Sequence, residues 1–239
     1  ELARYFEHSE QLLRLAAAGS AVLLPIEQRV KFIAPLLKDR FKAVRVAAAR
    51  SLIDSGITVQ QLPLLKQAFA ELQLTNQLSS WRGEGRLNQG SVEFGTGQLD
   101  AAEQSFLAAI KIEPYFESGY VNLAEFYRSQ QRAPQERSVL IRGMSKLPTS
   151  AALQYAYALS LIRQQQHAKA LDFFERAMVL HPTQQQYVYA YVLALDGQNK
   201  TALALSKLQQ LMVKFPNSQQ LKDLGLYLAN KEQNKQAYD

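Results

Sequence analysis

Four prolines spaced 34 residues apart are the feature of this sequence that most constrains its fold. They are Pro114, Pro148, Pro182 and Pro216. The segments FLAAIKIEP (106–114) and FERAMVLHP (174–182) place a phenylalanine, an alanine and a proline at the same positions. Proline lacks an N–H and clashes with the preceding turn, so each proline is expected to end a helix. A fixed period of this length predicts a chain of repeated structural units.

The prolines define four blocks when each is placed at position 32: 83–116, 117–150, 151–184 and 185–218. Position 24 is then large and apolar in every block: Phe106, Leu140, Phe174 and Leu208. Positions 8, 20 and 27 are mostly small, with departures at Glu136, Val192 and Leu211. Small residues let two helices approach closely, and the large residue fills the space between helix pairs. Polar turns such as SQQRAP (129–134) separate the two helices of a block.

This pattern resembles the tetratricopeptide repeat (TPR) family, whose 34-residue helix–turn–helix unit stacks into a superhelix. The resemblance covers residues 83–218. We therefore expect TPR units over 81–218 and a C-terminal capping helix over 219–239.

The N-terminal third repeats at a shorter spacing, since LRLAAAGSAV (13–22) aligns with VRVAAARSLI (44–53), 31 residues later. The second copy and the segment before it resemble a HEAT-type repeat. In that family an Asp and an Arg commonly bond across repeats, and Asp39 and Arg45, with Arg14 one repeat earlier, occupy those positions. The alternative is that they are solvated surface charges.

The whole chain is thus predicted to be all-α, a right-handed superhelical α-solenoid of helix–turn–helix repeats. HEAT-like repeats occupy 1–57, and a bridging helix over 58–80 follows, with Pro63 tolerated in its first turn. The first HEAT-like repeat contributes only its second helix, which predicts that the natural protein continues upstream of Glu1.

The order of these repeats is also similar to the C-terminal region of a family of bacterial multihaem c-type cytochromes. The segments that carry this similarity are RYFEHSEQLLRLAAA (4–18), IAPLLKDRFKAVRVAAARSLI (33–53) and SGYVNLAEFYRSQQR (118–132). The resemblance implies a periplasmic protein with a haem-bearing region upstream; without it, a cytoplasmic location is expected. The segment has no cysteine, so no haem attaches to it covalently and no cofactor is expected in it.

Motifs for catalysis are lacking in this sequence. The histidines at 8, 167 and 181 have no spacing that places two on one helix face, which argues against a zinc site. His181 is expected to cap a helix C-terminus and His167 to lie exposed in a turn. The stretch GEGRLNQG (83–90) lacks the spacing and the preceding strand of a nucleotide-binding loop. The protein is therefore predicted not to be an enzyme.

Net charge is +6, and the excess lies in residues 28–50. A basic face is predicted there, made of Arg29, Lys31, Lys38, Arg40 and Lys42. Such a face could supply phosphate contacts to a nucleic acid. Because no aromatic residues interleave as a stacking platform, a solvated face or docking to an acidic protein is favoured. The longest apolar run, AAAGSAVLL (16–24), falls short of the roughly 20 residues of a membrane span.

In TPR arrays the first helices of the blocks line a concave groove, chiefly through positions 2, 5, 9 and 12. The predicted partner-binding residues are Leu87, Ser91, Phe94, Val121, Asn122, Glu125, Arg128, Tyr155, Leu159, Ile162, Tyr189, Leu193 and, on the capping helix, Tyr227. The central ones form an apolar and aromatic stripe, and tyrosines are common interface anchors. The alternative is that these residues only pack between helices. Of the carboxylate clamp of chaperone-binding TPR proteins only Asn122 matches, so that role is disfavoured.

The function predicted from the sequence is a non-catalytic scaffold that binds a peptide or partner helix in the concave groove. The expected context is the C-terminal interaction region of a larger bacterial protein, with the upstream domain of the same chain as a further partner. The alternatives are a free-standing cytosolic TPR adaptor and a nucleic-acid binder that uses the basic face.

Overall fold

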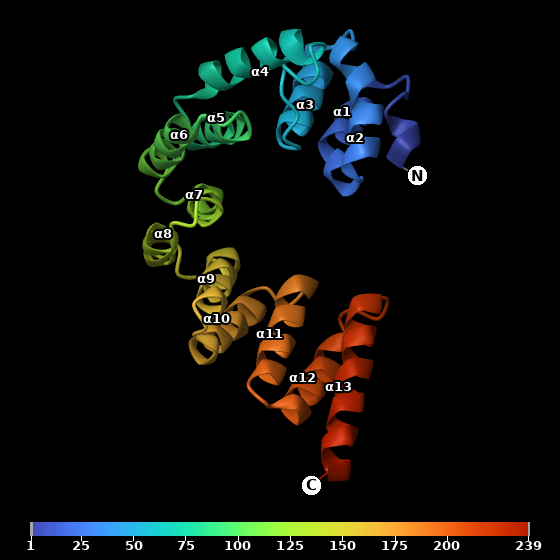
Figure 1. Ribbon diagram of the computed structural model, residues 1–239, viewed down its shortest axis with the longest axis vertical. Helices are drawn as coiled ribbons and strands as arrows, with labels where there is room; N and C mark the ends of the chain where they lie inside the picture. Colours follow the sequence, from blue (N-terminus) through green and yellow to red (C-terminus); the bar gives the residue numbers. More distant parts are fainter. Residues whose placement is uncertain (1, 239) are drawn as a thin grey trace. The chain divides into compact units, whose positions relative to one another are not determined.

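The computed structural model describes residues 2–238, and all regular structure in that range is helical (Figure 1). The all-α prediction is therefore confirmed. Consecutive helices pack against one another and are joined by short turns. Residues 1 and 239, the outer ends of the first and last predicted regions, lie outside the described residues. The chain divides into two compact units, with the boundary between Asn122 and Leu123 in helix α7. We call them unit 1 and unit 2.

Unit 1 contains nine helical segments before α7. They are η1 (Leu2–Tyr5), α1 (Gln11–Ser20), η2 (Ala21–Leu23), α2 (Ile26–Ile33), η3 (Ala34–Lys38), α3 (Lys42–Ile53), α4 (Leu65–Ser79), α5 (Gly83–Gly95) and α6 (Leu99–Ile112). The alanine runs that repeat at 31 residues form the contact between α1 and α3. Ala17, Ala18, Ala48 and Ala49 are all buried there, because small side chains allow the two helices to approach.

The bridging helix begins later than the sequence predicted. Helix α4 starts at Leu65, and Pro63 precedes it in a turn. Proline disfavours helical geometry in the residue before it, so the segment ahead of Pro63 does not join the helix.

Glycine at position 8 of the first block permits the close packing of α5 on α6. A Cβ added at Gly90 would lie 2.8 Å from the ring atoms Cδ1 and Cε1 of Phe106, the large residue at position 24 of the same block. Phe106 itself is 2% exposed. The small and large positions of the repeat thus contact each other directly.

Unit 2 continues the helix pairs. Its helices are the second part of α7 (Glu117–Ser129), then α8 (Ala133–Lys146), α9 (Ala151–Arg163), α10 (His167–Leu180), α11 (Gln185–Gly197), α12 (Thr201–Met212) and α13 (Gln219–Tyr238). The prolines lie in the turns that follow α8, α10 and α12, as predicted. After two of these turns a serine caps the next helix: Ser150 accepts from the Leu153 amide, and Ser218 accepts from the Leu221 amide.

One backbone conformation recurs at position 15 of all four blocks. Gly97, Gln131, Gln165 and Asn199 have φ between 57° and 78°, in the left-handed region. Each lies in the turn between the two helices of its block. Side chains other than glycine are disfavoured in this conformation, so its recurrence shows that the turn geometry follows the 34-residue period.

The departure at Glu136 from the small residue expected at position 20 has a structural explanation. Glu136 in α8 is 4% exposed, and its carboxylate pairs with the guanidinium of Arg163 in α9. A buried carboxylate needs such a partner, which the following block supplies.

Candidate partner-binding groove

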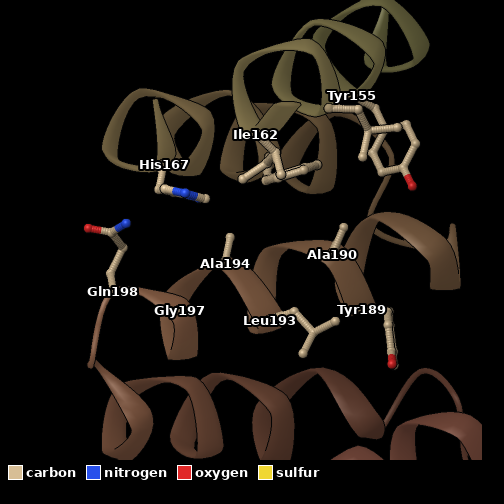
Figure 2. Close-up of a pocket in the computed structure, with 11 residues that line it drawn as sticks. Tyr155, Ile162, His167, Tyr189, Ala190, Leu193, Ala194, Gly197 and Gln198 are labelled. Atoms are coloured by element: carbon tan, nitrogen blue, oxygen red, sulfur yellow. The ribbon is translucent and has the colours of Figure 1, made fainter. Parts of the chain in front are cut away.

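A cavity of about 330 Å³ lies among α9, α10 and α11 of unit 2 (Figure 2). We call it the groove cavity. Its lining residues are Tyr155, Leu159, Ile162, His167, Phe174, Tyr189, Ala190, Leu193, Ala194, Gly197 and Gln198. Apart from the tyrosine hydroxyls, His167 and Gln198, this lining is apolar.

Helical spacing explains why the predicted residues converge on this cavity. Tyr155, Leu159 and Ile162 are separated by four and three residues, so they share one face of α9. Tyr189 and Leu193 are four residues apart on α11. All five were predicted groove residues.

Two small residues of α11 complete the lining. Figure 2 shows Ala190 and Ala194 directed toward the α9–α10 pair. Because an alanine projects only a methyl group, these two positions leave space between the helices.

Tyr155 is held in place by its neighbours. Its ring centroid lies 5.0 Å from that of Tyr187 and 5.7 Å from that of Phe174, in tilted arrangements. Its hydroxyl accepts a hydrogen bond of 2.9 Å from Gln186 Nε2. Tyr155 therefore both packs between helices and presents part of its ring to the cavity. Leu193, in contrast, is 38% exposed.

Two polar residues at one end of the groove cavity were missed as site residues. His167 is the first residue of α10, not a turn residue, and it is exposed as predicted. Gln198 follows the end of α11. The first helices of the blocks set the predicted groove, so a residue from a second helix and one from a turn had no signal in that scheme.

The other predicted groove residues do not line this cavity. In unit 1, Leu87 is buried, the hydroxyl of Ser91 donates to its carbonyl, and Phe94 and Val121 are partly buried. The Asn122 side chain donates to the carbonyl of Ser118 on its own helix.

Three predicted groove residues of unit 2 lie on exposed surface instead. Glu125 and Arg128 form an ion pair with each other on α7. Tyr227 is 51% exposed on α13, and Lys231 Nζ lies 5.9 Å from its ring centroid.

The predicted basic face has four exposed cations, Lys31, Lys38, Arg40 and Lys42. Arg29 has a structural role instead. Its guanidinium donates to Ser55 Oγ at 2.6 Å and to the carbonyls of Val22 and Leu24, and so joins α2 to the preceding turn and to the residues after α3.

Asp39 and Arg14 are bonded across the 31-residue repeat. Arg14 Nε lies 2.6 Å from Asp39 Oδ2, and the side chains are 11% and 6% exposed. The hydrogen bond from Arg14 lowers the pKa of Asp39 below its usual value. Arg45 instead donates to the Asp39 carbonyl and pairs with Glu71 of α4 at 2.6 Å. These charges are therefore structural, not solvated.

A buried carboxylate also joins the capping helix to unit 2. Lys231 of α13 donates to both carboxylate oxygens of Asp196 at 2.7 and 2.8 Å, and Thr201 donates at 2.7 Å. Burial alone would raise the pKa of Asp196, but the hydrogen bonds from Lys231 and Thr201 outweigh it and lower the pKa. Nearby, burial and the neighbouring Glu175 raise the pKa of Tyr191 to about 12.

The described residues show no grouping of three or more His, Cys, Asp or Glu side chains suited to a metal ion. No helix among them combines the length and apolar character needed to cross a membrane.

No protein-family model matches this chain, and no curated protein matches it. Solved structures do. A thermophilic TPR protein of Thermus thermophilus, TTC0263, is 16% identical with a TM-score of 0.52, covering 86% of this chain and 99% of its own. A MamA RS-1 double mutant is 14% identical with a TM-score of 0.51, covering 72% and 95%. At these identities the likeness concerns the fold alone. The chain has the fold of a TPR-like α-solenoid.

Proposed function

We propose that this protein is a non-catalytic protein-interaction scaffold whose groove cavity receives an apolar side chain of a partner. The observation that supports this most is the convergence of five predicted groove residues on one apolar cavity of about 330 Å³. This volume lies at the lower end of ligand-binding cavities, which run from about 300 to 1,000 Å³. A single Leu, Phe or Trp side chain is of suitable size.

The polar groups around this cavity suit a segment of polypeptide chain. The Tyr155 hydroxyl, His167 and Gln198 can hydrogen-bond to backbone or polar groups on either side of the apolar side chain. Burying one such side chain contributes about 1.5–3 kcal/mol, so a peptide or helix with one apolar residue here would also need contacts elsewhere.

The wider context is proposed from the sequence resemblances. In this proposal the chain is the C-terminal interaction region of a larger bacterial protein, with HEAT-like repeats before the TPR blocks at the boundaries given above. If the multihaem cytochrome resemblance holds, the location is periplasmic. A free-standing cytosolic adaptor remains the alternative, and the exposed lysines of the basic face would then suit an acidic protein surface.

A variant that fills the groove cavity tests the proposal without removing existing contacts. In Ala194→Leu the added side chain occupies the space beside Ile162 and Ala190, whereas Ala202→Leu adds the same atoms on an exposed position of α12. Peptides selected from a random display library on the wild-type chain would be measured by fluorescence polarisation. We expect apolar or aromatic residues to recur in them, and Ala194→Leu to weaken binding at least tenfold, about 1.4 kcal/mol.

The control variant should bind as the wild type does. The double variant Tyr155→Ala with Tyr189→Ala should also lose binding while its helical content by circular dichroism is unchanged. Equal binding of the selected peptides to the wild type and to Ala194→Leu would contradict the proposal.

A further inference from the structure

A second cavity of about 440 Å³ lies in unit 1, between the C-terminal half of α4 and helix α5. We call it the polar cavity. Its lining includes Gln73, Asn76 and Gln77 of α4 and Arg86, Gln89 and Glu93 of α5. The groove residues are not part of it, and the proposed scaffold function does not use it.

The repeat register shows that this polarity is a departure. Arg86, Gln89 and Glu93 occupy positions 4, 7 and 11 of the first block. The same positions are Tyr120, Leu123 and Tyr127 in the second block and Val188, Tyr191 and Leu195 in the fourth, and all six are buried. The first block therefore has polar side chains where these two blocks have packing residues.

Contacts at two points keep α4 and α5 in place around the cavity. A Cβ added at Gly85 would lie 1.9 Å from the Ser79 carbonyl oxygen, so the start of α5 directly contacts the end of α4. Further along, Arg50 donates to Asn88 at 2.9 Å and to Asn76 at 3.1 Å. The cavity is therefore bounded by fixed helices.

Hydrogen bonds orient most of the polar side chains of α5. Arg86 donates through one terminal nitrogen to Gln89 at 3.2 Å, and Gln89 donates to Glu93 at 2.8 Å. The other carboxylate oxygen of Glu93 accepts from Ser105 at 2.6 Å. Gln89 and Glu93 thus have defined positions.

The Nε atom of Arg86 is the exception. It is buried and has no hydrogen-bond partner among the described residues. A buried donor of a charged group without an acceptor is costly. Nε and the adjacent terminal nitrogen form an edge of the guanidinium that matches the two oxygens of a carboxylate. The chemistry of this edge therefore calls for an oxyanion.

The charges in the cavity restrict which oxyanion is suitable. Arg86 and Glu93 are the charged side chains of its lining, one of each sign. A dianion such as phosphate would meet the negative charge of Glu93. A molecule with one carboxylate and one ammonium group would pair with both side chains, and the surrounding carboxamides both donate and accept hydrogen bonds.

We propose that the polar cavity binds a small zwitterion, with its carboxylate on the Nε edge of Arg86 and its ammonium group facing Glu93. A free amino acid and a short peptide both carry this pair of groups. The site is separate from the groove cavity, and neither proposal depends on the other.

The test uses the whole chain and isothermal titration calorimetry with a defined set of compounds. These are L-glutamine, glycyl-L-glutamine, N-acetyl-L-glutamine, L-glutaminamide and inorganic phosphate. We expect the first two to bind. Loss of the ammonium group in the acetylated compound, or of the carboxylate in the amide, should weaken binding at least tenfold. Tighter binding of the amino acid than of the dipeptide would identify a free amino acid as the ligand class, and the reverse order a short peptide.

Arg86→Gln should reduce binding of the zwitterions at least tenfold. Arg82→Gln is the matched control, because Arg82 is exposed, lies four residues away and does not line the cavity. If Arg86→Gln fails to fold, the comparison of capped and uncapped compounds on the wild type still decides. The proposal is overturned if no zwitterion binds at millimolar concentration. Equal binding of the capped compounds, tighter binding of phosphate, or zwitterion binding unchanged in folded Arg86→Gln would overturn it too.

Discussion

Replacing Gly90 by alanine tests whether the small position of the repeat is required by the large one. The added Cβ would lie 2.8 Å from the Phe106 ring and 3.2 Å from the Ala102 carbonyl oxygen, closer than carbon atoms pack. Overpacking of this kind costs about 1–3 kcal/mol. Alanine in a helix interior is favoured over glycine by about 0.8–1.0 kcal/mol, which offsets part of that cost. We therefore expect unit 1 to lose about 1 kcal/mol of stability.

Gly225 of α13 provides a matched control. It also lies inside a helix, but a Cβ there would meet only Leu208 Cδ2 at 3.6 Å, an ordinary contact. Gly225→Ala should therefore stabilise unit 2 by about 0.5–1 kcal/mol. The two substitutions are chemically identical, so opposite signs would isolate the effect of packing.

The assay is urea denaturation followed by circular dichroism, together with amide hydrogen exchange, since the two units can unfold in separate steps. Phe106→Leu combined with Gly90→Ala should recover part of the loss, because the smaller side chain vacates the contact. The reasoning is refuted if Gly90→Ala stabilises unit 1 as Gly225→Ala stabilises unit 2.

Three further predictions concern buried charges. The pKa of Asp196 is lowered in the folded state, so its pair with Lys231 stabilises above about pH 4 and is lost as the pH falls through the folded pKa; Asp196→Asn should flatten the acid limb of a urea-denaturation series. Glu136→Ala should destabilise unit 2 by about 1–2 kcal/mol in urea, less than a fully buried pair because Arg163 is 40% exposed and can reach water. Asp39→Asn should cost unit 1 about 1.5–3 kcal/mol at pH 7, and thermal melts should show that difference narrowing in acid as the wild-type carboxylate protonates.

Much of the fold could be predicted because the repeat fixes the chemical class of particular positions. The proline period predicted the turns after α8, α10 and α12, and the pairing of Gly90 with Phe106 followed from positions 8 and 24. The left-handed turn residues were not predicted, since Gln131 and Gln165 carry no sign of a positive φ. The start of α4 was placed too early because Pro63 was accepted inside the first turn instead of before it.

The candidate groove was predictable only in part. Tyr155 and Leu193 could be assigned because groove positions recur along the first helices. His167 could not, since it reaches the same cavity from a second helix. The polar cavity went unnoticed for a different reason: the sequence comparison considered positions 8, 20, 24 and 27, whereas Arg86 departs at position 4.

A repeat offers a way to separate structural charges from binding groups, because each position has a defined environment. Glu136 and Arg86 both place a charge where the corresponding positions of other blocks carry small or apolar residues. Arg163 of the next block compensates the first charge, so that departure is explained within the fold. The Nε of Arg86 has no such partner among the described residues. Since burial without a partner is unfavourable, the second departure requires something from outside the chain, and the proposed zwitterion supplies it.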